Sequence, residues 1–93
     1  QIEGEVSTYS LSNNYPNPFN PSTKIRFTIP ERSNVSLKIF NLLGSEVAEL
    51  VDSQMEAGDY RVEFNVLGLT SGIYFYRLQT DSFIDTKKMI YLK

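Results

Sequence analysis

The sequence predicts an all-β protein, specifically an immunoglobulin-like antiparallel β-sandwich of about seven strands. Apolar and polar residues alternate with a period of two over most of the chain after residue 22, as in strands that bury one face. Turn-forming residues separate these segments at intervals of about 8–12 residues, which is the spacing of sandwich strands. No amphipathic stretch is free to form the crossover helix that a parallel sheet requires.

Six alternating segments are expected to be strands, and residues 6–11 could supply a seventh. The six are TKIRFTI (23–29), NVSLKIFN (34–41), EVAELV (46–51), DYRVEFNV (59–66), GIYFYRLQT (72–80) and FIDTKKMIYLK (83–93). Pro30 ends the first, because proline cannot donate to a strand ladder. EVAELV fits one helical turn as well as a short strand. The alternation predicts that the following residues face inward: Ile25, Phe27, Ile29, Val35, Leu37, Ile39, Tyr60, Val62, Phe64 and Val66.

Two tyrosines in LTSGIYFYRL refine the sandwich prediction. Immunoglobulin-like domains carry a tyrosine two residues before their second core cysteine, and its hydroxyl bonds to the backbone just upstream. Here Tyr76 occupies the cysteine's place, so we expect Tyr74 to bond to the turn at residues 68–71. That register also turns Ile73 and Phe75 outward, where a pair of exposed apolar side chains would suit docking.

The composition argues against catalysis. The chain has no histidine and no cysteine, so thiolate nucleophiles, disulfides and thiolate metal sites are excluded. Its net charge is −2 and its nine Lys and Arg residues are scattered, which gives no footprint for nucleic acid. No apolar run is long enough to span a membrane. A calcium site at Asp52, Glu56 and Asp59 is conceivable, but a solvated acidic loop is the better interpretation. We therefore expect no enzyme activity, no cofactor and no metal.

The segment NNYPNPFNPST, residues 13–23, combines three prolines with two aromatic residues. Each residue before a proline is pushed toward an extended conformation, so the segment should form a stiff elbow. Three well-placed prolines could stabilise the fold by roughly 1–3 kcal/mol by restricting the unfolded chain. We expect the elbow to set the angle to an upstream domain and to seal one end of the core with Tyr15 and Phe19. The alternative is a carbohydrate-binding face made by exposed Tyr15, Phe19 and Phe75.

The order of several motifs resembles a known family. The series YPNPFNPST, KIRFTIP, VSLKIFNLLGSEV, AGDYRVEFN, LTSGIYFYRL and KKMIYLK is similar to the type A C-terminal sorting domain of the type IX secretion system, found on exported proteins of Bacteroidetes. The resemblance runs from about residue 11 to residue 93. One departure is NVLGL, where Val66 and Leu67 make a turn more apolar than is usual in the family. The immunoglobulin-like module of flagellar hook-capping proteins is a similar relative that shares the Asn-Pro opening.

The resemblance implies a function and a set of partners. Residues 1–10 would be a linker from an upstream cargo domain, and residues 11–93 would be the sorting domain. Shuttle proteins and the translocon would recognise the domain in the periplasm, and the cargo would become secreted or displayed on the cell surface. Carried over to this chain, the recognition residues are Pro16, Asn17, Pro18, Phe19, Gly72, Tyr74, Lys87, Lys88 and Lys93.

Other interpretations remain open at this stage. A structural spacer or interaction module of the hook-cap kind would have the same fold without a targeting role. The last segment, KKMIYLK, carries apolar residues on both faces, with Met89 and Tyr91 on one and Ile90 and Leu92 on the other. Such a strand is either buried in the core or offered at a sheet edge to a partner.

Overall fold

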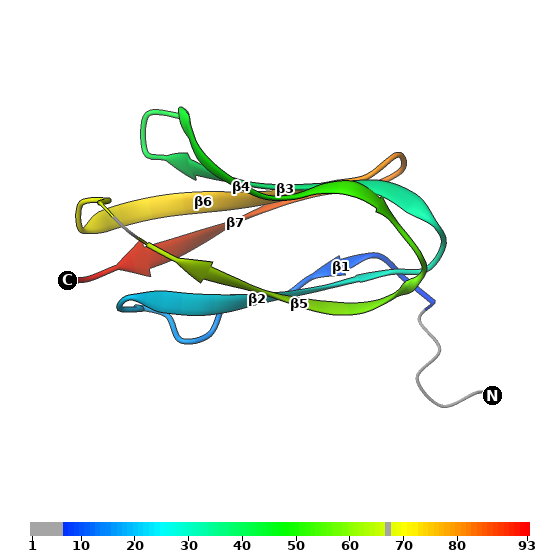
Figure 1. Ribbon diagram of the computed structural model, residues 1–93, viewed down its shortest axis with the longest axis horizontal. Coiled ribbons are helices and arrows are strands. Elements are labelled where there is room, and N and C mark those ends of the chain that lie inside the picture. Colours follow the sequence, from blue (N-terminus) through cyan, green and yellow to red (C-terminus); the bar gives the residue numbers. More distant parts are fainter. Residues whose placement is uncertain (1–6, 67) are drawn as a thin grey trace.

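The chain forms two antiparallel sheets packed face to face in the computed structural model, which describes residues 7–66 and 68–93 (Figure 1). Within those residues there are seven strands and no helix, so no helix in them is long and apolar enough to cross a membrane. The strands are β1 (Ser10–Leu11), β2 (Ser22–Ile29), β3 (Ser33–Asn41), β4 (Glu46–Met55), β5 (Gly58–Asn65), β6 (Gly72–Gln79) and β7 (Ile84–Tyr91). The predicted all-β sandwich is confirmed.

The two sheets are built from strands that are distant in sequence. One sheet has the order β1-β2-β5 and the other has the order β4-β3-β6-β7. The pairs β2–β5, β3–β6 and β6–β7 correspond to those of immunoglobulin constant domains, but the fourth strand here pairs with the third rather than with the fifth. The edges of the larger sheet are therefore β4 and β7.

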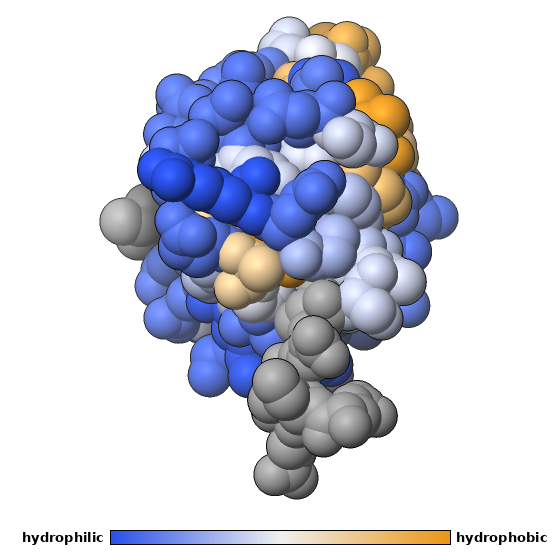
Figure 2. Space-filling view, turned by 90° about the vertical axis from the view of Figure 1, so that its right-hand side faces the viewer, coloured by the Kyte–Doolittle hydropathy of each residue, from blue (hydrophilic) through white to orange (hydrophobic). Residues whose placement is uncertain are grey.

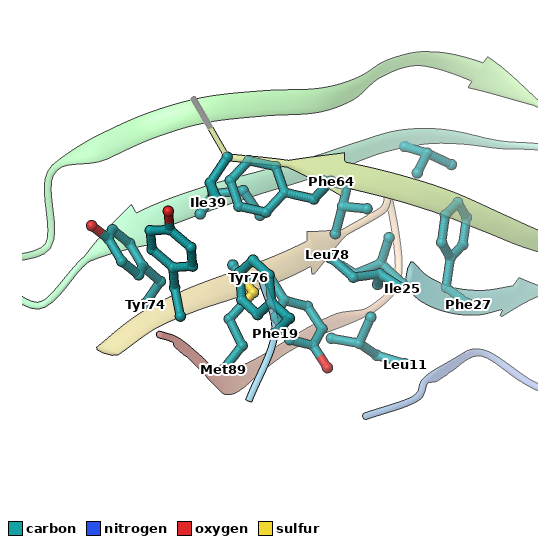
Figure 3. Packing of buried hydrophobic residues seen from close by; sticks show 14 of the residues in the cluster. Leu11, Phe19, Ile25, Phe27, Ile39, Phe64, Tyr74, Tyr76, Leu78 and Met89 are labelled. Carbon is teal, nitrogen blue, oxygen red and sulfur yellow. The ribbon is translucent and has the colours of Figure 1, made fainter. Parts of the chain in front are cut away.

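The core lies between the inner faces of the two sheets (Figure 3). The residues of β2 and β3 that were predicted to face inward are all buried, and so are Phe64 and Val66. Tyr60 and Val62 of β5 are half-buried and pack against this core. Because side chains alternate along a strand, the polar residues between them, such as Lys24 and Arg26, remain exposed.

Two elements differ in length from the expectation. β4 runs for ten residues, well beyond the predicted residues 46–51. Its pairing with β3 shifts register between Leu37 and Lys38 and again between Ile39 and Phe40. Both shifts fall within the predicted residues 46–51. The part that the sequence pattern missed, residues 52–55, pairs regularly with β3 but consists mainly of exposed polar residues. β1 covers only Ser10–Leu11 of the expected residues 6–11, and residue 6 lies outside the described residues.

The residues just before β1 are also attached to the sandwich. The ring of Tyr9 stacks on Phe83, with 5.3 Å between ring centroids and an interplanar angle of 8°. Its hydroxyl donates to Glu31 at 3.1 Å. The predicted linker, residues 1–10, thus includes at least one residue that packs against the domain, while residues 1–6 lie outside the described part of the chain.

The predicted tyrosine bond is present. The Tyr74 hydroxyl donates to the backbone carbonyl of Thr70 at 2.7 Å. Tyr74 and Tyr76 are buried, whereas Ile73 is exposed and Phe75 is half-buried on the outer face. The chain departs from the usual family sequence at Val66 and Leu67, which precede these tyrosines. Val66 is buried, and Leu67 lies outside the described residues.

Candidate functional site

Three segments that are distant in sequence meet at one end of the sandwich. They are the proline segment (residues 13–23), the turn at residues 70–72 and the end of the last strand (residues 90–93). Figure 1 shows that this end, which carries the C-terminus, lies opposite the end where the described chain begins. This arrangement does not favour the expectation that the proline segment sets the angle to an upstream domain, which stays a prediction.

Phe19 anchors the proline segment in the core. Its side chain is only 2% exposed. Its ring lies 6.2 Å from that of Phe64 in β5 and 5.4 Å from that of Tyr91 in β7, measured between centroids. Phe19 therefore contacts strands of both sheets and closes the gap between them at this end (Figure 3). The predicted sealing role is confirmed for this residue.

Tyr15 does not share that role. It is 81% exposed, so the expectation that it seals the core is wrong. Its backbone forms an antiparallel bridge with Lys24 through hydrogen bonds of 2.9 and 3.0 Å. Neighbouring side chains along extended backbone point to opposite sides, and the buried neighbour is Asn14, so Tyr15 faces the solvent. With Phe19 buried, the aromatic carbohydrate-binding face is also ruled out.

A buried polar pair, which the sequence pattern did not reveal, holds the start of the proline segment. The Asn14 amide donates to the Thr23 hydroxyl at 3.0 Å and to the Pro16 carbonyl at 3.2 Å, and the Thr23 hydroxyl donates to that carbonyl at 2.8 Å. Asn14 and Thr23 are both buried. Buried polar groups require such partners, so this pair fixes the two ends of the segment to each other. The only signal in the sequence was an asparagine placed before a proline turn.

The proline segment also occupies the outer edge of β7. The Phe19 N–H donates to the Ile90 carbonyl at 3.0 Å, and the Leu92 N–H donates to the Phe19 carbonyl at 3.1 Å. The Ile90 N–H donates to the Asn17 side-chain oxygen at 3.0 Å. The Asn17 amide oxygen thus takes the place of a backbone carbonyl as the acceptor for the Ile90 N–H. The terminal strand is both a core strand and an edge strand, and its edge is covered from Ile90 onward.

The turn before β6 holds the last residue. The Lys93 N–H donates to the Ser71 hydroxyl at 2.9 Å. Gly72, which pairs with Tyr91, has a φ of +154°, a conformation that is rare for residues with a Cβ. The glycine therefore allows the turn to start β6 while Ser71 reaches the end of β7. Ser71 belongs to the LTSGIYFYRL motif, but it was not among the nine predicted recognition residues.

The nine predicted recognition residues fall into two groups. The first group lies at the converging segments: Pro16, Asn17, Pro18 and Phe19 in the proline segment, Gly72 in the turn and Lys93 at the end of the chain segment 90–93. Tyr74 follows the turn in β6 and donates to the Thr70 carbonyl. The lysines of β7 do not converge on this end. Lys88 is exposed and pairs with Phe75, whereas Lys87 is half-buried on the inner side of the strand and pairs with Tyr76.

The ionisable side chains form no cluster that could hold a metal ion among the residues that the structure describes. No group of three or more metal-liganding side chains is found there. Asp52 lies in β4 and Asp59 in β5, rather than in the predicted acidic loop, and only Glu56 lies between these strands. Arg26 donates to Asp59 at 2.9 and 2.6 Å, and this hydrogen bond lowers the pKa of the Asp59 carboxyl.

Tyr76 has a strongly raised pKa and supports the proline segment from inside the core. Tyr76 is fully buried, and its hydroxyl donates to the Ser12 carbonyl at 2.7 Å, just before the proline segment. Burial disfavours the charged phenolate and raises the pKa of Tyr76 to about 12, against the opposing effect of a hydrogen bond from the Asn14 backbone. This tyrosine is therefore a neutral structural tie between β6 and the start of the proline segment.

The domain is thus a small β-sandwich in which three segments of the chain are hydrogen-bonded together at one end. Residues 13–92 match the family described as the secretion system C-terminal sorting domain, and the chain belongs to this family. The family is that of the type IX secretion system of Bacteroidetes, as the motifs indicated. Comparisons with curated proteins and with solved structures give no match.

Proposed function

We propose that this domain, attached behind a cargo domain in the same chain, directs the cargo through the type IX system from the periplasm across the outer membrane. In this proposal residues 1–10 link the two parts and residues 11–93 form the sorting domain. It acts by being recognised and not by catalysis. The released or surface-displayed product would be the cargo.

The observation that carries the proposal is the convergence of the three segments. Four hydrogen bonds of 2.9–3.1 Å join the proline segment and the Ser71 turn to the end of β7. These are the segments to which the family resemblance assigns recognition. Because they meet only in the folded chain, the signal is a folded surface and not a linear peptide. The three segments lie at the end opposite the first described residues (Figure 1), the side from which an upstream cargo would be attached in this proposal.

An export assay tests the proposal. The whole 93-residue chain is fused behind a periplasmic reporter in a host with a type IX system, and the exported fraction is measured. We expect export, and a fusion that stays in the periplasm while a known sorting domain exports the same reporter would refute the proposal. A fusion of residues 11–93 tests the boundary, and equal export would support the linker assignment.

A second set of fusions tests the recognition residues. Deleting residues 89–93 is unsuitable, because Met89 and Tyr91 are buried and their loss would unfold the domain. The substitutions Lys87→Gln, Lys88→Gln and Lys93→Gln remove the charges instead and leave the buried residues in place. We expect the triple variant to keep the wild-type melting temperature and to lose export. Unchanged export would remove the lysines from the recognition site.

A further inference from the structure

The turn between β3 and β4 holds two leucines rigidly in the solvent. Leu42 is 66% exposed and Leu43 is 90% exposed. The Asn41 side-chain oxygen accepts hydrogen bonds from the N–H groups of Leu43 and Ser45 at 3.0 and 2.9 Å, and two backbone bonds of 2.9 Å close the same turn. Figure 1 shows this turn rising above the larger sheet at the end that carries the C-terminus. Adjacent exposed leucines in a fixed turn mark a contact surface more strongly than scattered ones do.

The leucine turn continues into an apolar area on the outer face of the larger sheet. Pairing places Ile73 beside Ile90 and places Phe75 beside Phe40. A hollow of about 240 Å³ lies between the turn and Phe75, and a second of about 230 Å³ separates the turn from residues 70–74. The opposite end of the sandwich is mainly hydrophilic, with an apolar area along its upper right side and a smaller one below its centre (Figure 2).

The rim of this area on the β6–β7 side is positively charged. The Arg77 guanidinium lies over the Phe40 ring, 4.5 Å from its centroid, and Lys88 pairs with Phe75. Neither cation forms an ion pair with any residue in the described ranges. On the β4 side, Glu46 and Glu49 are already paired with Lys38, at 3.4 and 3.8 Å. The cations available to a partner therefore lie on the β6–β7 side, whereas the β4 side has two carboxylates for the single Lys38 ammonium.

We propose that this surface, made by Leu42, Leu43, Ile73, Phe75, Arg77 and Lys88, docks a partner protein whose surface is apolar at its centre and acidic at its rim. A second copy of the chain is the competing occupant, and the tests below distinguish it from a different partner protein. The inference rests on the proposed function, because the surface adjoins the residue 70–72 turn and the partner would be a component of the export machinery.

Export of the full 93-residue fusion tests the apolar part. We expect the double variant Leu42→Gln, Leu43→Gln to export about tenfold less than wild type, as for central contacts of an interface. The matched control is Ile84→Gln, which changes an apolar side chain of 59% exposure at the far end of β7 and should export normally. If the double variant melts lower than wild type, Leu43→Gln alone, at the more exposed position, should still reduce export.

The charged rim is tested by reversal. Arg77→Glu with Lys88→Glu should reduce export, whereas Lys24→Glu with Arg61→Glu, an equal charge change at exposed positions of the other sheet, should not. Normal export of either surface variant would overturn the inference. Sedimentation that shows a wild-type dimer abolished by Leu43→Gln would assign the face to a second copy and overturn it as well. A wild-type fusion that is not exported refutes the proposed function itself, and the inference with it.

Discussion

The Ile90 N–H donates to the side-chain oxygen of Asn17, a residue 73 positions earlier, at 3.0 Å. This bond lies on the outer edge of β7, the edge that is not paired with β6. An unpaired edge is a template for pairing with another chain, and proteins usually cover it. Here the proline segment covers the last residues of β7 with two backbone bonds from Phe19 and one side-chain bond from Asn17. The backbone groups of Ile90 and Leu92 on this edge are therefore already hydrogen-bonded within the domain.

The Asn17 bond can be removed by a single substitution. Asn17→Ala leaves the Ile90 N–H without its acceptor and should lower the free energy of unfolding by about 0.5–1.5 kcal/mol. Amide exchange at Ile90 should become faster. Asn17→Asp keeps an oxygen acceptor at the same place and serves as the control, with exchange at Ile90 close to wild type. Equal exchange rates in the alanine variant and wild type would contradict the role given to this side chain.

The two aromatic residues of the proline segment should behave differently. Phe19→Ala removes a buried ring from between the sheets and should destabilise the fold by about 3–5 kcal/mol. Tyr15→Ala changes a side chain that is 81% exposed and should shift the free energy of unfolding by no more than about 0.5 kcal/mol. Urea denaturation of the two variants measures both. Similar losses in the two would show that Tyr15 packs against the core after all.

Position 72 requires glycine because of its backbone conformation, and not because a side chain would lack room. A Cβ built at this position meets no atom within 4 Å, but the φ of +154° is unfavourable for L-residues. Gly72→Ala should therefore cost about 1–3 kcal/mol in stability. D-alanine introduced at residue 72 by chemical synthesis favours positive φ and should restore much of the loss. A thermal melt of Gly72→Ala that matches wild type would contradict this account.

The strands could be predicted because sheet faces impose a period of two, and β2, β3 and β6 follow it without interruption. The burial of individual residues in the proline segment could not be predicted in this way, because consecutive X-Pro steps interrupt the alternation. Nothing in the local sequence distinguishes buried Phe19 from exposed Tyr15. The bonds from Ile90 to Asn17 and from Lys93 to Ser71 join residues 73 and 22 positions apart. Such side-chain to backbone bonds depend on the sheet order, which sequence patterns do not give.

Tyr76 should make the stability of the fold depend on alkaline pH. Its pKa is raised by burial from 10.0 to about 12 in the folded chain. Between these values the unfolded chain has lost the proton and the folded chain has kept it, so the free energy of unfolding falls as pH rises. The contribution of Tyr76 to the free energy of unfolding is fully present below pH 10 and is lost as the pH rises to about 12. At about 1.4 kcal/mol per pKa unit, the loss amounts to roughly 2–3 kcal/mol.

The variant Tyr76→Phe isolates this effect from the other groups that titrate at high pH. Below pH 10 wild type should be the more stable, because the variant lacks the bond to the Ser12 carbonyl. Above pH 10 the wild-type advantage should shrink and then reverse, because only the wild-type unfolded chain gains a phenolate at this position. Urea denaturation of both proteins at pH 8, 10 and 11.5 measures the difference. A difference that stays constant across these three values would show that Tyr76 ionises as readily in the folded chain as in the unfolded one.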